Sequence, residues 1–183
     1  YTSIVFMALV SADLRFTMIN IGFYVKNNDG GVFANSVFGK KMLNQELDLQ
    51  DDKPLHDGGD PMPHVVVANE AFRLLPNLMK PYPKRGITRD RQNFNSHLLR
   101  ARSSVDCAFG LLASKFQIFH FPISVKPENV DKLIKAACAL HNFILVREGR
   151  SEEEFPAPEA FVALTNEVDN AEVNVNASSR HAR

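Results

Sequence analysis

The sequence predicts an α/β domain in which helices cover a sheet. The opening run, Tyr1 to Val10, is apolar and rich in β-forming residues, as expected of a strand covered on both faces. A second short apolar run, His64 to Ala68, also indicates a buried strand. Two long segments with helical spacing of apolar residues follow it. Strands that alternate with amphipathic helices are typical of layered α/β folds.

Length and composition exclude several classes of protein. A chain of 183 residues with 45% hydrophobic and 23% charged residues can bury the core of one domain. No apolar run reaches the roughly 18 residues that a membrane helix needs, so we expect no membrane partner. The two cysteines favour a reducing compartment. The first ten residues lack the features of a signal peptide, and we expect the native chain to extend beyond Tyr1.

Charge is distributed unevenly along the chain. From Ser151 onward there are seven acidic residues and two basic ones, a net charge of −5, so the body carries +5 because the whole chain is neutral. A basic body permits a polyanionic partner. Few aromatic residues occur in this acidic part, so we predict a disordered tail over residues 150–183 and a folded domain over residues 1–149.

The first half of the chain predicts short elements separated by turns. After a turn at Ser11–Leu14, the run Arg15–Gly22 is expected to pair with the opening strand as a hairpin. A helix is predicted from about Gly31 to Glu46, and a surface loop from Asp48 to Pro63. The proline-rich segment Phe72–Arg85 is incompatible with a regular helix or a central strand.

Two long helices are predicted in the second half. The first follows Thr88, a suitable N-cap, and its apolar residues recur every three or four positions as far as Phe116. The second begins near Pro127, continues to about Arg147 and is closed by Gly149.

Three carboxylates end or flank buried elements and are candidate ligands for a hard divalent cation such as Mg²⁺. They are Asp13, Glu70 and Asp106. Spacing alone favours the alternative that each is a solvated charge in a loop or at the rim of the domain. Asp106 could also pair with Arg102 one helical turn earlier.

A basic stretch with interleaved aromatic residues is a candidate DNA-binding surface, although a solvated helix face gives the same pattern. Within 23 residues it contains Lys80, Lys84, Arg85, Arg89, Arg91, Arg100 and Arg102. Cys138 and His141 are three residues apart, but with no second pair they do not predict a zinc site, and we expect them to pack in the helix.

Seven motifs, in order, resemble the nuclease domain of the PIF/Harbinger-type transposases and their domesticated derivatives. The resemblance covers about Tyr1 to Gly149. The motifs are Asp29–Ser36, Ala68–Phe72, Leu78–Pro83, Phe94–Asn95, Arg100–Arg102, Val105–Gly110 and Leu140–Phe143. The resemblance implies a ribonuclease-H-like fold, with a mixed sheet flanked by helices, and a triad of acids that holds two Mg²⁺ or Mn²⁺ ions for cutting DNA.

By this resemblance, two of the three acids are replaced. The first aspartate of the family falls at Ser11, the second at Asn69, and the third acid is Asp106. Serine and asparagine offer only neutral oxygens, so most of the negative charge is gone and binding of the metal ions is in doubt. Asp13 and Glu70 are adjacent carboxylates that could substitute as metal ligands.

Three hypotheses follow for function. The first is a non-catalytic scaffold that binds DNA or a chromatin protein. The second is an active endonuclease that uses Asp13, Glu70 and Asp106, and the third is a transposon remnant without a function. The resemblance implies a location in the nucleus, with the cytoplasm as the alternative, and a DNA or nuclear protein partner.

Overall fold

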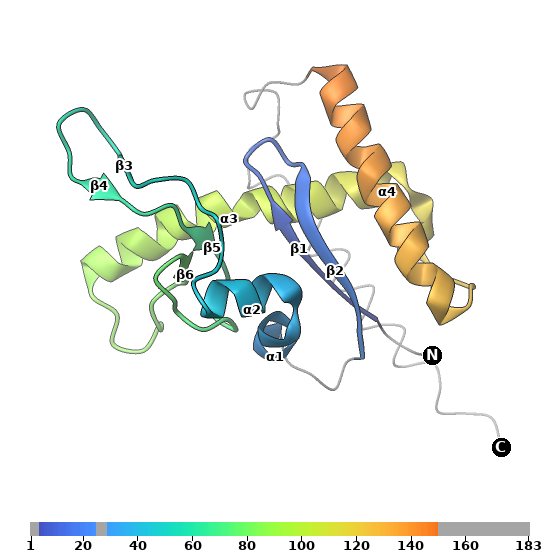
Figure 1. The fold of residues 1–183 in the computed structure, drawn as a ribbon, viewed down its shortest axis with the longest axis horizontal. Coiled ribbons are helices and arrows are strands. Elements are labelled where there is room, and N and C mark those ends of the chain that lie inside the picture. Colours follow the sequence, from blue (N-terminus) through green and yellow to red (C-terminus); the bar gives the residue numbers. More distant parts are fainter. Residues whose placement is uncertain (1–3, 25–28, 150–183) are drawn as a thin grey trace. The chain divides into compact units, whose positions relative to one another are not determined.

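The computed structural model describes residues 4–24 and 29–149, and these form two compact units (Figure 1). The first unit contains Tyr1–Met7 and Ile19–Arg102, and the second contains Ala8–Met18 and Ser103–Arg183, as far as these residues are described. The tail predicted to be disordered lies outside the described residues. Described helices are mixed with three small sheets of two strands each, which is consistent with an α/β fold.

The β1–β2 hairpin agrees with the sequence-based prediction. Strand β1 covers Ile4–Val10, and β2 covers Phe16–Tyr24. The intervening turn is closed by hydrogen bonds from the Ser11 amide to the Arg15 carbonyl and from the Leu14 amide to the Ser11 carbonyl, both at 3.0 Å. The hairpin contributes residues to both units.

The helix predicted from about Gly31 to Glu46 is in fact two helices, α1 (Asp29–Asn35) and α2 (Val37–Leu43) (Figure 1). Ser36 interrupts it because its backbone is extended, with ψ of 156°, and its hydroxyl caps α2. This hydroxyl accepts from the Gly39 amide at 2.9 Å and donates to the Phe33 carbonyl at 2.7 Å. The capping residue therefore ends one helix and starts the next.

Short strands complete the first unit. The segment predicted as a surface loop contains an exposed antiparallel pair, β3 (Lys53–Pro54) and β4 (Pro61–Met62). The strand predicted at His64–Ala68 is only β5 (Val66–Val67), which pairs in parallel with β6 (Leu78–Met79). Strand β6 is two residues long because prolines lie close on each side of it.

A small hydrophobic core holds these elements of the first unit together. Phe33, Met42 and Leu78 are buried at its centre. Phe33 packs edge-on against Phe38 and Phe72, with ring centroids 6.2 and 5.5 Å apart. The core thus links the α1–α2 pair to the segment that follows β5.

The two long helices have the ends that the sequence predicts. Helix α3 covers Arg89–Lys115 after Thr88, whose hydroxyl lies 3.4 Å from the Arg91 amide. A single 3₁₀ turn, η1 (Gln117–His120), follows it. Helix α4 covers Pro127–Glu148 and ends at Gly149, which has the left-handed conformation.

Two polar side chains of α4, which we call the α4 clamp, hold the hairpin turn in the second unit. The Asn142 amide accepts from the Phe16 amide and donates to the Phe16 carbonyl, both at 2.9 Å. His141, fully buried, contacts the Leu14 carbonyl through Nε2 at 2.9 Å. Leu14 has a φ of 62°, a strained value for a branched side chain, and the clamp helps to hold it there.

Burial decides the charge of His141. Desolvation holds the pKa of this imidazole below its usual value of 6.5, nearby Lys115 acts in the same direction, and the hydrogen bond to Leu14 opposes them only in part. The other ring nitrogen, Nδ1, is buried without a hydrogen-bond partner among the described residues. The folded chain therefore holds a neutral imidazole whose Nε2–H donates to Leu14.

Gly39→Ala is expected to destabilise the first unit by about 2 kcal/mol or more. A Cβ at this position would lie 1.8 Å from the Phe33 carbonyl oxygen, so the helix break at Ser36 would have to shift. Thermal unfolding followed by circular dichroism measures the effect. Lys40→Ala, at the next and exposed position of α2, is the control and should change stability by less than about 0.5 kcal/mol. Equal melting temperatures for the two variants would contradict this account.

Acid is expected to destabilise the second unit through His141. Because its pKa is lower in the folded state, the unfolded chain takes up the proton first. Stability is therefore fully present above about pH 6.5 and falls below it, by at most about 1.4 kcal/mol per pH unit for this one proton. Urea unfolding between about pH 7.5 and about pH 5.5 measures this slope. His141→Gln should flatten it, whereas exposed His64→Gln should not. An unchanged slope in His141→Gln would refute the assignment.

Candidate functional site

Ser11, which the resemblance predicts to stand at the first acid position of the family, is part of the hairpin turn. Its hydroxyl donates to the Asp13 carboxylate, and the Arg15 carbonyl lies 3.2 Å from it as an alternative acceptor. Together with its backbone hydrogen bonds, these contacts tie Ser11 to the other residues of the turn. Its side-chain oxygen is therefore already used in local structure.

Asp13, the carboxylate nearest to Ser11, is paired inside the same turn. It receives hydrogen bonds from the Ser11 hydroxyl and from the Arg15 guanidinium, with which it also forms an ion pair. Desolvation acts to raise the pKa of Asp13, but these two hydrogen bonds and the charge of Arg15 outweigh it and lower the pKa. The carboxylate is thus ionised, with its charge offset by Arg15.

Asn69 and Glu70 follow β5 in the first unit, at a bend rather than along a strand. The Asn69 side-chain oxygen accepts from the Ala71 amide at 2.9 Å, which is the geometry of an Asx turn. Glu70 is exposed, and its carbonyl accepts from the Lys80 ammonium at 3.2 Å. The Asn69 side chain, like that of Ser11, therefore stabilises a local turn.

Asp106 is half-buried on α3 in the second unit and takes part in an interaction with a neighbour, as does Arg102. The ion pair that the sequence suggests between these two residues stays a prediction.

The candidate carboxylates are divided between the two units: Glu70 lies in the first, and Asp13 and Asp106 lie in the second. Neither unit, over its described residues, contains a group of three or more histidine, cysteine, aspartate or glutamate side chains that could hold a metal ion. In the second unit Asp13 is already paired with Arg15. Cys107 and Cys138 are both buried thiols, and desolvation raises the pKa of Cys138 to about 11, so neither is a ready thiolate ligand.

The predicted basic stretch is mostly exposed. Lys84, Arg85, Arg89 and Arg91 are exposed, and over the described residues no acidic side chain forms an ion pair with them. Lys80 is half-buried and bonded to the Glu70 carbonyl, and Arg100 and Arg102 each have another interaction. The free positive charge is therefore concentrated in the residues just before α3 and in its first turn.

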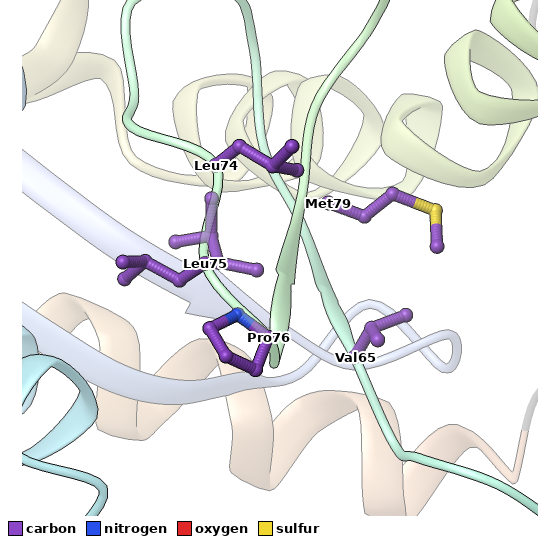
Figure 2. Close-up of a pocket in the computed structure, with 6 residues that line it drawn as sticks. Val65, Leu74, Leu75, Pro76 and Met79 are labelled. Atoms are coloured by element: carbon purple, nitrogen blue, oxygen red, sulfur yellow. The ribbon is translucent and has the colours of Figure 1, made fainter.

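An open apolar pocket of about 440 Å³ lies beside β5 and β6 in the first unit (Figure 2). Its lining residues are Val65, Leu74, Leu75, Pro76, Leu78 and Met79. A binding or catalytic pocket normally has a few polar groups that orient its ligand, and this lining has no polar side chain. We therefore assign no chemistry to it.

Sequence reasoning missed the structural importance of Asn95 and Asn142. Each amide bonds both backbone groups of one distant residue, Tyr82 and Phe16 respectively. The available signal was an asparagine placed inside a helix, where it is unfavourable without a specific partner.

Comparison with known proteins gives a family. The profile of the DDE superfamily endonuclease family matches residues 1–142. The chain is also 26% identical over 161 residues to a protein described as "Protein ALP1-like" from Arabidopsis thaliana. That alignment covers 84% of this chain but only 38% of the relative, so the chain spans well under half of the relative's length. No solved structure matches the chain.

None of the described helices is long and apolar enough to cross a membrane. The hairpin, the strand that precedes Asn69 and both long helices as far as Asn142 all lie inside the matched region. Because the match extends over most of the sequence, the chain belongs to the DDE superfamily endonuclease family.

Proposed function

We propose that this chain is a transposase-derived protein that binds DNA without cutting it, on a ribonuclease-H-like frame. The observation that carries the proposal is how the side chains of Ser11 and Asn69, the two positions where the resemblance expects acids, are used. Both side chains form hydrogen bonds within tight turns, so they serve local structure in place of metal binding. Membership in an endonuclease family supports the ancestry, and the Harbinger-type motifs support the closer relationship.

The charge at these positions accounts for the loss of cutting. Catalysis by two metal ions needs carboxylates that hold both ions beside the attacking and leaving oxygens of the phosphodiester. Two neutral residues remove two negative charges, and Arg15 offsets the charge of Asp13. Asp106 alone cannot supply the ligands for both ions. Mg²⁺ or Mn²⁺ is therefore a cofactor of the ancestor in this proposal and not of this chain.

The exposed positive charge of the basic stretch supports DNA binding, the part of the family's function that we propose is retained. The exposed cations before α3 and in its first turn have no acidic partner among the described residues, so phosphate groups can neutralise them. DNA is the polyanion that the family ancestry favours. We place the protein in the nucleus on that ground, where a chromatin protein is a further possible partner.

A divergent active endonuclease is the second candidate. The observation in its favour is that Asp13 is ionised and lies only two residues beyond Ser11. An active endonuclease would require Arg15 to release Asp13 for metal binding, with Glu70 and Asp106 as the further metal ligands. The two candidates differ in one measurable property, which is cutting of DNA.

The purified chain is expected not to nick supercoiled plasmid DNA in Mg²⁺ or Mn²⁺, because it lacks the charge that both ions need. Gel electrophoresis of the plasmid detects nicking. Cutting by the unmodified chain that disappears in Asp106→Ala would establish the second candidate and refute the proposal.

Restoring the acids should restore affinity for the cations. The double variant Ser11→Asp/Asn69→Asp is expected to bind Mn²⁺ at least about tenfold more tightly than the unmodified chain, by calorimetry. The variant Ser114→Asp/Asn129→Asp adds the same charge at exposed positions and is the matched control. Equal affinity in the two double variants would show that Ser11 and Asn69 do not occupy ligand positions.

The basic stretch should set the salt dependence of DNA binding. In Lys84→Ala/Arg85→Ala, the slope of log K against log salt is expected to be shallower by about 0.9 for each phosphate of duplex DNA that the variant no longer neutralises. Fluorescence anisotropy at several salt concentrations measures it. Lys126→Ala/Lys132→Ala removes the same charge from exposed positions elsewhere. If both variants keep the original slope, the basic stretch is not the DNA-binding surface.

A further inference from the structure

Tyr82 is an exposed aromatic residue within the basic stretch. It is 43% exposed, in the proline-flanked segment between β6 and α3 of the first unit. A singly exposed ring is ordinary on a protein surface, but this ring lies in a segment with several exposed cations.

The backbone of Tyr82 is held firmly in place. Asn95, on α3, accepts from the Tyr82 amide at 2.8 Å and donates to its carbonyl at 2.9 Å. Both backbone groups of Tyr82 are thus satisfied by one rigid side chain on a helix. A ring on such a support loses little conformational entropy when a ligand binds to it.

Arg91 and Phe94 contact the Tyr82 ring, and Asn95 holds its backbone; we call these four residues the Tyr82 platform. The guanidinium carbon of Arg91 lies 4.9 Å from the Tyr82 ring centroid, a cation–π contact. Phe94 packs edge-on against the same ring, with centroids 5.3 Å apart. The platform thus combines an exposed aromatic ring with a planar cation.

Three further basic residues lie between Tyr82 and Arg91 in the sequence. Lys84 and Arg85 follow Tyr82 in the turn that ends at Gly86, whose φ is 67°, and Arg89 begins α3. All three side chains are exposed and have no acidic partner among the described residues. A ligand that uses the platform therefore meets several cations, and this favours a ligand with flat rings joined by negative charges.

We propose that the Tyr82 platform binds an unpaired nucleobase of single-stranded DNA, while Lys84, Arg85 and Arg89 bind the adjacent phosphates. The inference deepens the proposed function and rests on its DNA binding. Bases stack on aromatic rings and on guanidinium planes, whereas the bases of a duplex already stack on one another and offer no free face. An acidic peptide would satisfy the cations but would leave the ring unused.

The first test compares binding of the full chain to a fluorescent oligothymidylate and to a duplex of mixed sequence. Tyr82→Ala is expected to weaken binding of the single strand by about tenfold, within the range measured for stacking of one base. Tyr82→Phe keeps the ring and should retain the affinity. The salt slope should be the same in all three proteins, because every cation that binds a phosphate is still present.

Phe143 offers a matched control. It is 59% exposed, and the Arg147 guanidinium lies 5.8 Å from its ring centroid, so it forms a similar exposed pair outside the basic stretch. Phe143→Ala should leave binding of the single strand unchanged. Equal losses in Tyr82→Ala and Phe143→Ala, or no loss in either, would overturn the inference.

A second test does not depend on how Tyr82→Ala folds. The chain contains no tryptophan, so Tyr82→Trp introduces its only tryptophan, which preserves an aromatic ring and can be excited selectively over the remaining tyrosines. Addition of oligothymidylate is expected to quench its emission by stacking, and duplex of the same charge should quench it much less. Phe143→Trp is the control and should show no quenching. Absence of quenching in Tyr82→Trp while the strand is bound would overturn the inference.

The two proposals fail in different ways. If the chain binds neither single-stranded nor duplex DNA, the proposed function fails and the platform has no nucleic-acid role. If the chain binds duplex DNA with a normal salt slope and Tyr82→Ala changes nothing, the proposed function stands and the stacking inference alone is refuted.

Discussion

The second unit depends on two hydrogen bonds between one asparagine side chain and the backbone of Phe16. β2 pairs with β1, and at Phe16, its first residue, the Asn142 side chain bonds both backbone groups, so the start of the strand is also fixed to α4. Phe16 is buried there, with its ring edge-on to Phe109 and to His141 at centroid separations of 5.5 and 5.0 Å. Removal of the amide would leave two backbone groups unsatisfied in a buried place, which costs about 1 to 3 kcal/mol for each group.

This constraint also positions the residues on which the functional argument depends. The turn between β1 and β2 carries Ser11 and Asp13, and the α4 clamp holds its last residues in one strained conformation. A turn fixed in this way is suitable for presenting acids in a constant geometry. The same turn now closes on itself through the contacts of Asp13 with Ser11 and Arg15. In the proposal made above, the same few residues thus combine the frame of the family with a changed set of charges.

Features with a local cause could be predicted from the sequence. Thr88, Pro127 and Gly149 mark the helix ends, since capping acts over three or four residues. Apolar spacing identified both long helices for the same reason. The break at Ser36 was missed because the cap competes with a strong helical pattern on both sides, and the close approach of Gly39 to Phe33 is visible only in three dimensions. The ribonuclease-H-like sheet stays a prediction, since the described strands pair only two by two.

Long-range contacts were beyond prediction, and they affect how the chain is made. Phe16 and Asn142 are 126 residues apart. At a synthesis rate of about 5 to 20 residues per second, the asparagine is added roughly 6 to 25 s after its partner. Throughout that interval the Phe16 amide and carbonyl lack the partner that Asn142 supplies in the folded chain, and the Phe16 ring lacks its contact with His141, so this segment stays open to chaperone binding.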